Sequence, residues 1–284
     1  MNKIPKKLHM YWDNSPMSRL QVFTIETFHS LNPDWEIYLY LPIQIYVRKK
    51  QYIPNYTGKD YFNLINNMDY VKQEFIDISK YGIDSNLHNI LRSDIFRYHI
   101  LYNEGGLWGD FDIIWLKPIS HMNNIPSAGN VDVEHMGASI HFYNTTHGHI
   151  GIGILFSTKG HSLYRALINK TKQIQINQKN KDSHGHQDFG SDMWSGMFPH
   201  LNTVLKSYPD VVSIPYETFA PYGIHNLNAL YKDVNLSYIN NNVLGIHWFN
   251  GHSLSKEYIN NELFNKDRDC SMTTILKQLN YIEN

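Results

Sequence analysis

The chain of 284 residues has one cysteine, Cys270, which excludes an intramolecular disulfide. This scarcity fits a reducing compartment, and the lone thiol is best interpreted as a small hydrophobic side chain. Neither sign of charge is in excess, since 25 Lys and Arg balance 26 Asp and Glu for a formal charge of −1. The balance excludes a whole-molecule attraction to nucleic acid or to anionic lipid.

Long apolar runs are also missing. No stretch approaches the roughly 18 residues that a membrane span needs. The first residues, 1–7, lack the apolar segment of a signal peptide. We therefore expect a soluble, cytoplasmic protein with no transmembrane segment. Charged residues make up only 18% and aromatic residues 14%, which argues for a folded chain with a large core.

The N-terminal segment alternates between strand and helix patterns. Residues 7–12 are typical of a short strand, and 13–16 form a turn cluster. Residues 18–31 have helical apolar spacing with Ser18 as the N-cap, and 35–41 form a second strand. A strand, a helix and a strand in this order open an α/β fold.

The same patterns predict the later elements. A helix is expected over 84–103, capped by Asp84 or Ser85, and a single strand over 107–116. The stretch 120–151 is predicted to be rich in loops, and 178–190 to be a long polar loop. The other expected elements are strands at 152–157, 211–214 and 243–249, and helices at 162–176 and from 256 to the end.

One charged residue interrupts the apolar face of the helix over 84–103. Asp94 falls within the stripe formed by Leu87, Leu91, Tyr98 and Leu101. A carboxylate on such a face needs a partner, and Arg97 lies three residues further on. The helix alone leaves a structural ion pair and a functional pair equally open.

Two carboxylates follow a run of glycines. Asp110 and Asp112 come after Gly105, Gly106 and Gly109. In an extended chain, residues i and i+2 point to the same side. Both carboxylates could therefore bind one Mg²⁺ or Mn²⁺, or one could bind the metal and the other a sugar hydroxyl. The alternative is a solvated strand end, because an isolated Asp-x-Asp is a weak signal.

Taken together, these motifs resemble the Asp-x-Asp sugar-transfer family, a glycosyltransferase family 32-like group. It includes enzymes similar to the yeast initiating α-1,6-mannosyltransferase, capsular polysaccharide transferases and, remotely, the large clostridial glucosylating toxins. The opening segment 4–12 also resembles the family's first strand. The motifs that carry the resemblance are Ser93-Asp94-x-x-Arg97, Leu101-Tyr102, Gly105-Gly106 and Asp110-Phe111-Asp112.

The resemblance implies a fold, a donor and a cofactor. The fold would be GT-A, an α/β architecture with a Rossmann-like nucleotide-binding sheet flanked by helices in one domain, 1–284. Residues 1–118 would bind the nucleotide-sugar and 119–284 would form the acceptor side. The donor would be a nucleotide-sugar, with a UDP-sugar favoured, and the cofactor Mn²⁺ or Mg²⁺. Transfer would retain the anomeric configuration, and the acceptor would be a glycan, a lipid-linked molecule or a protein.

The resemblance also assigns roles by position. It places the metal at Asp110, Asp112 and His247, with Asp112 as the firmest ligand. It gives catalytic roles to Asp94 and Arg97. The residues it assigns to the nucleotide and the donor sugar are Trp12, Tyr11, Ser93, Asp94, Arg97 and Asp110.

Other features leave alternatives open. Asp188, in the polar loop, is a catalytic candidate, although a solvated loop carboxylate is the other interpretation. Family members often carry a Trp at the position that follows Ser253, and this chain lacks it. A non-catalytic relic that only binds a nucleotide-sugar therefore stays an alternative. A Mg²⁺-dependent phosphohydrolase of the haloacid dehalogenase type also uses Asp-x-Asp. That class needs an apolar strand before the first Asp, whereas 105–109 is rich in glycine.

Overall fold

A computed structural model describes residues 3–44, 56–87, 89–124, 136–142, 150–179, 201–260 and 268–283. Its central feature is a mixed sheet of eight strands. Four of these strands run parallel in the order β3-β2-β1-β4. They are β1 (Lys7–Tyr11), β2 (Glu36–Pro42), β3 (Val71–Ile76) and β4 (Gly106–Gly109).

The other half of the sheet begins with an antiparallel neighbour of β4. This is β8 (Ile154–Ser157), which places Gly109 opposite Ile154. β8 then pairs antiparallel with β6 (Ala138–Phe142). Two further strands border β6, namely β7 (Ile150–Gly151), antiparallel to it, and β9 (Val211–Pro215), parallel to it.

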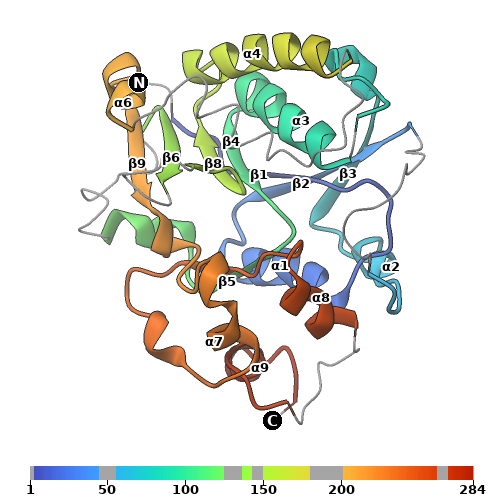
Figure 1. Cartoon of the computed structure of the whole chain (residues 1–284), viewed down its shortest axis with the longest axis vertical. Coiled ribbons are helices and arrows are strands. Elements are labelled where there is room, and N and C mark those ends of the chain that lie inside the picture. Colours follow the sequence, from blue (N-terminus) through green and yellow to red (C-terminus); the bar gives the residue numbers. More distant parts are fainter. Residues whose placement is uncertain are drawn as a thin grey trace.

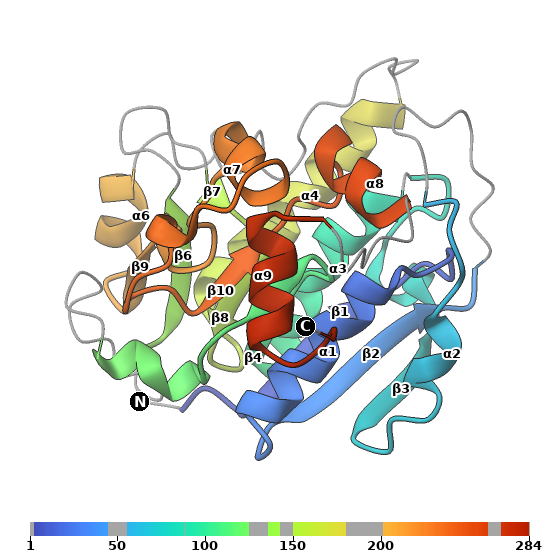
Figure 2. The same cartoon turned by 90° about the horizontal axis from the view of Figure 1, so that it is seen from below.

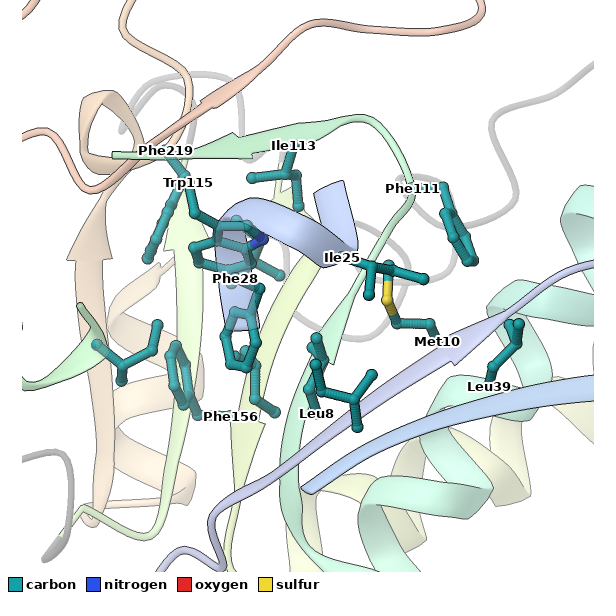
Figure 3. Packing of buried hydrophobic residues seen from close by; sticks show 14 of the residues in the cluster. Leu8, Met10, Ile25, Phe28, Leu39, Phe111, Ile113, Trp115, Phe156 and Phe219 are labelled. Carbon is teal, nitrogen blue, oxygen red and sulfur yellow. The ribbon is translucent and has the colours of Figure 1, made fainter. Parts of the chain in front are cut away.

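Helices cover both faces of this sheet (Figure 1). On one face lie α3 (Asn89–Glu104) and α4 (Ser162–Lys179), and on the other lies α1 (Arg19–Leu31). Side chains alternate along β1, so that Leu8 and Met10 pack with α1 (Figure 3). Tyr11, on the opposite side of β1, packs with Phe96 of α3. Each face of the sheet therefore has its own buried core.

A second, two-stranded sheet lies on the α1 side. It pairs β5 (Ile113–Trp115) antiparallel with β10 (Gly245–His247). Three C-terminal helices gather around it (Figure 2). They are α7 (Leu227–Tyr231), α8 (Ser253–Asn260) and α9 (Ser271–Gln278), with a shared apolar core.

The remaining short elements connect these layers. They are the helices α2 (Phe62–Ile65) and α6 (Leu201–Ser207) and the 3₁₀ turns η1 (Ile78–Tyr81), η2 (Ile119–Asn124), η4 (Tyr216–Thr218), η5 (Ile224–Asn226) and η6 (Leu236–Tyr238).

The prediction of one strand over 107–116 is wrong. The chain leaves the main sheet after Gly109, and residues 113–115 pair with β10 instead. Two contacts fix the break, because the Asp110 N–H donates to the Gly153 carbonyl at 2.8 Å and Thr24 Oγ1 donates to the Phe111 carbonyl at 2.9 Å. The two carboxylates therefore do not share one extended strand.

Two other boundaries also differ from the prediction. The helix over 84–103 begins at Asn89, because the Asp84 side chain accepts hydrogen bonds from the backbone and side chain of Asn86 and forms a turn. The loop-rich interpretation of 120–151 missed β6, whose pairing with β8 and β9 is long-range.

The α/β class is confirmed, with a Rossmann-like sheet flanked by helices as the GT-A resemblance implies. The division into a donor half, 1–118, and an acceptor half, 119–284, stays a prediction. Within the described ranges, no helix is both long enough and apolar enough to span a bilayer.

Candidate functional site

Arg97 on α3 lies at the centre of the site and is almost fully buried, with 3% of its side chain exposed. Its Nη2 lies 2.6 Å from Asp94 Oδ1, one turn earlier on the same helix. Its Nη1 donates to the Ile152 carbonyl oxygen at 2.5 Å, and both terminal nitrogens contact Asp110. The guanidinium also lies over the Trp108 indole, 5.0 Å from the ring centroid. Two carboxylates therefore share one buried cation.

This contact set keeps Arg97 charged. Burial alone would lower the pKa of its guanidinium, but Asp110 and then Asp94 raise that pKa above its ordinary value. Both terminal nitrogens already bind protein oxygens. The contacts of Arg97 are therefore those of a group that orients carboxylates.

Asp110 is held from two sides at the end of β4. Trp108 Nε1 donates to Oδ1 at 2.8 Å, and the Arg97 fork contacts both oxygens at 3.3 and 3.4 Å. Burial raises the pKa of the Asp110 carboxyl, and the nearby charge of Asp112 adds to this, although Arg97 opposes it. The side chain keeps 29% of its surface exposed, so this carboxylate is fixed in place yet open to a ligand.

Asp112 has a different partner. Its Oδ2 lies 3.0 Å from His247 Nε2 and accepts a hydrogen bond from the Asn250 N–H at 2.9 Å. Its backbone carbonyl accepts from the Trp248 N–H at 2.8 Å. The antiparallel pairing of His247 with Ile113 brings these residues together. The β5-β10 ribbon thus places a predicted C-terminal ligand beside the second carboxylate of Asp-x-Asp.

The charge states of this pair are coupled. Burial would raise the pKa of Asp112, but the charge and hydrogen bond of His247 and the Asn250 N–H hold that pKa below its usual value. Burial would likewise lower the pKa of His247, but Asp112 raises it above 6.5. Because a histidine ligand must be neutral, a cation binding here would displace the His247 proton.

Asp112 Oδ1 is the atom that tests whether these residues fit a cation. It is buried and accepts no hydrogen bond from any residue that the structure describes. A buried carboxylate oxygen without a donor is costly unless a cation or another donor satisfies it. A hard divalent cation fits this position, with Asp112 and His247 as the protein ligands.

No group of three or more His, Cys, Asp or Glu among the described residues forms a complete metal site. Mg²⁺ commonly takes one or two protein carboxylates and completes its shell with water and substrate phosphates. Asp110 and His247 both lie close to Gly153, since a Cβ placed on this glycine would be 3.1 Å from Asp110 Oδ2 and 3.7 Å from His247 Cε1. Asp110 and His247 therefore border the same space above Gly153.

Trp12, one of the predicted nucleotide-binding residues, lies beside the Asp-x-Asp turn. Trp12 follows β1, donates from Nε1 to the Ser15 carbonyl at 2.7 Å and stacks edge-on with Phe111 at 5.0 Å. It is only partly buried, and Phe111 stands between the two carboxylates in sequence. Ser93 is partly buried on α3. The structure therefore groups Trp12 with the Asp-x-Asp turn.

Tyr11 stands apart from the others. Tyr11 is 7% exposed, and its ring packs against Phe96 on the α3 side of the sheet. Burial raises the pKa of its hydroxyl to about 12, so the group stays protonated. Asp188 lies outside the described residues.

Sequence reasoning missed several residues that shape the site. Trp108 and Gly153 carried usable signals: Trp108 precedes Asp110 by two positions, and Gly153 belongs to a glycine pair typical of a close approach. Ile152 and Asn250 act through backbone atoms, so their side chains carry no pattern. Phe249 stacks on His247 with ring centroids 4.1 Å apart, a contact that only the folded chain defines.

With this geometry in place, comparison with known sequences is informative. Residues 18–132 match a family profile described as "Glycosyltransferase sugar-binding region containing DXD motif". The matched segment contains Ser93, Asp94, Arg97, Asp110 and Asp112, and the predicted resemblance is confirmed there. No curated protein sequence matches the chain.

Glycosyltransferases are among the similar solved structures. The PaToxG glycosyltransferase aligns at 18% identity and a TM-score of 0.47, over 72% of this chain and 74% of that one. The UDP-bound domain of the YGT toxin aligns at 10% and 0.42, over 73% and 70%. The galactosyltransferase LgtC, solved with donor and acceptor sugar analogs, aligns at 11% and 0.48, over 90% and 96%. Since all three TM-scores fall below 0.5, we take the α/β class from the strand order itself.

Proposed function

We propose that this chain is a metal-dependent glycosyltransferase, because residues 18–132 match the profile of a glycosyltransferase sugar-binding region with an Asp-x-Asp motif. It moves a sugar from a nucleotide-sugar, with a UDP-sugar as the favoured donor, to a hydroxyl of a glycan, a lipid-linked molecule or a protein. The resemblance of the motifs supports retention of the anomeric configuration.

The observation that carries the proposal is the unsatisfied oxygen of Asp112. Oδ1 is buried and has no donor within the described part of the chain, while Oδ2 is fixed by His247 and Asn250. Asp112 and His247 would hold Mn²⁺ or Mg²⁺, with Asp110 bordering the same space. When bound, the cation stabilises the negative charge that develops on the leaving diphosphate.

Arg97 acts by positioning carboxylates. Its ion pair with Asp94 and its fork on Asp110 fix two acceptor groups on one side of the site. Such groups bind donor hydroxyls in one orientation, which aligns C1 of the sugar with the incoming acceptor. Asp110, the more exposed of the two, is the better placed to bind a sugar hydroxyl or the cation.

Trp12 supplies an aromatic face for the base. Its indole is partly exposed and held by the Ser15 carbonyl and the Phe111 edge. A rigid, partly exposed ring suits base stacking, which is tolerant of base identity. Because stacking on Trp12 does not distinguish one base from another, the preference for UDP rests on the family resemblance.

The reaction needs no strong side-chain base. The bond from C1 to the diphosphate oxygen breaks, and a bond from C1 to the acceptor oxygen forms. The hydroxyl proton passes to the leaving diphosphate or to solvent. Asp188, which lies outside the described residues, stays a proposed catalytic residue.

The experiment is release of nucleoside diphosphate from a panel of nucleotide-sugars, with Mn²⁺ and with EDTA. Metal-dependent release from one donor supports the proposal and identifies the sugar. Nucleotide binding without turnover, even when acceptors are added, would favour a non-catalytic relic. Release of phosphate from simple esters would favour the phosphohydrolase and contradict the proposal.

A further inference from the structure

Phe249 has an unusual backbone conformation beside the proposed metal ligand. Its φ is +52°, in the left-handed region. Two other non-glycine residues of the described chain share this sign, Asn14 and Asn280, and both are Asn, which tolerates that region. For a bulky side chain the conformation is strained, and such strain persists only where the surroundings enforce it.

The surroundings enforce it through Trp248. The Trp248 indole is fully buried. The backbone N–H of Trp248 donates to the Asp112 carbonyl at 2.8 Å, and the Trp248 carbonyl accepts from Tyr231 Oη at 3.0 Å and Ser255 Oγ at 2.6 Å. The peptide on either side of Trp248 therefore cannot rotate to relieve the strain at the next residue.

The left-handed turn has two consequences for the site. It folds the Phe249 ring back onto the imidazole of His247, with centroids 4.1 Å apart and planes at 29°. It also brings the Asn250 N–H to Asp112 Oδ2 at 2.9 Å. One strained residue thus restrains both partners of the Asp112–His247 pair.

We propose that Phe249 is a positioning residue, whose ring holds the His247 imidazole in the orientation that binds the cation. This inference rests on the proposed function and extends it to a residue that contacts neither metal nor donor. An imidazole is free to turn about two side-chain bonds, and one hydrogen bond to Asp112 leaves its plane poorly defined. The stacked ring fixes that plane, as outer contacts commonly do for metal-binding histidines.

The stack also accounts for the cost of the strain. A fold that needed only a turn between β10 and α8 could use Gly or Asn at this position. Unlike Gly or Asn, Phe249 provides an aromatic ring that covers the His247 imidazole. The ring is therefore the feature to test, separately from the turn.

The first test uses the metal-free protein. Phe249→Leu keeps most of the apolar volume but removes the flat ring, Phe249→Tyr keeps the ring, and Phe75→Leu is the control at an exposed phenyl on β3. NMR follows the His247 imidazole protons, identified by their loss in His247→Asn. We expect the chemical shifts of these protons to move downfield in Phe249→Leu only, because that variant alone loses the ring stacked on the imidazole. Unchanged chemical shifts of the His247 imidazole protons in Phe249→Leu would contradict the stacking of Phe249 on His247.

The second test measures Mn²⁺ affinity by electron paramagnetic resonance at saturating UDP. We expect Phe249→Leu to weaken Mn²⁺ roughly tenfold or more, with the wild-type value restored in Phe249→Tyr. In turnover, the metal concentration for half activity should rise while kcat at saturating metal is kept. Equal Mn²⁺ affinity in wild type and Phe249→Leu would overturn the positioning role alone. Absence of Mn²⁺ binding in the wild type would instead overturn the proposed function.

Discussion

Arg97 and Asp110 meet through two parallel contacts, from Nη2 to Oδ1 at 3.3 Å and from Nη1 to Oδ2 at 3.4 Å. The same guanidinium binds Asp94 at 2.6 Å and is almost fully buried. A planar fork can hold two carboxylates at once, whereas an ammonium group offers a single point charge. The orientation of Asp110 therefore depends on arginine and not on positive charge alone.

Replacing Arg97 should separate folding from positioning. Arg97→Met leaves two carboxylates without their cation and should cost about 3–5 kcal/mol of unfolding free energy. Arg97→Lys should recover much of that stability, yet lower kcat/KM on the order of 10²-fold, because a small misplacement of the donor is costly. Urea unfolding and steady-state kinetics measure the two effects.

Arg19→Lys is the matched control for this comparison. Arg19 pairs with Glu26 at 2.8 Å and lies over the Phe23 ring at 4.3 Å, so it has similar contacts away from the site. Its substitution should leave kcat/KM unchanged. Full activity in Arg97→Lys would show that charge alone is sufficient and would refute the positioning role.

Gly153 sets the space in front of Asp110. A Cβ here would lie 3.1 Å from Asp110 Oδ2, and Trp108 and Arg97 prevent that carboxylate from yielding. Gly153→Ala should therefore weaken binding of the donor and metal and also lower thermal stability, because the backbone at residue 153 has to move away from the fixed carboxylate. Ile152→Val, which keeps the backbone carbonyl that binds Arg97, is the control. Unchanged Mn²⁺ and UDP affinities in Gly153→Ala would show that this space is not used.

His9 gives the fold a dependence on pH. It is fully buried between Tyr40 Oη, 3.0 Å from Nδ1, and the Gly105 carbonyl, 2.9 Å from Nε2. Burial lowers its pKa from 6.5 to about 4, so the folded protein keeps it neutral. As the pH falls from 6.5 towards 4, the unfolded chain binds this proton and the folded chain does not. Stability should fall over that window by up to about 3 kcal/mol.

Denaturant unfolding at several pH values tests this dependence. His9→Gln keeps a donor and an acceptor but does not titrate, so its stability should fall less between pH 6.5 and 4 than that of the wild type. His99, whose pKa burial also lowers to about 4, contributes separately and is retained in both proteins. Parallel pH curves for the two proteins would refute the account of His9.

The sequence predicted much of the site because its motifs are local. Asp94 and Arg97 lie one helical turn apart, and their contact follows from helix geometry. The strand, helix and strand of β1, α1 and β2 follow from short-range patterns in the same way.

The errors arose where distant contacts decide the outcome. Residues 107–116 are uniformly apolar apart from the two carboxylates, and only pairing with β10 shows that the chain changes sheets there. Asn250 binds Asp112 through a backbone N–H, for which no side chain provides a signal. The same holds for the left-handed turn at Phe249, because nothing in its local sequence demands it.

Trp12 tests the nucleotide end of the site. Trp12→Ala should weaken UDP binding by roughly 1–3 kcal/mol, the usual contribution of base–aromatic stacking. Trp12→Phe should keep most of the affinity, since it retains an aromatic face. Calorimetric titration with UDP measures both variants. The control is Trp35→Phe, at an indole that packs edge-on against Phe28. An affinity in Trp12→Ala equal to that of the wild type would remove Trp12 from the site.

The most direct test of the metal-dependent transferase is UDP affinity with Mn²⁺ and with EDTA, in the wild type and in Asp112→Asn. Asp34→Asn, at an exposed carboxylate paired with Lys6, is the control. We predict that Mn²⁺ strengthens UDP binding in the wild type and in Asp34→Asn. In Asp112→Asn, UDP should bind equally weakly with and without the metal. A full Mn²⁺ effect in Asp112→Asn would contradict the account, because the buried, unsatisfied oxygen of Asp112 would then not be the metal ligand.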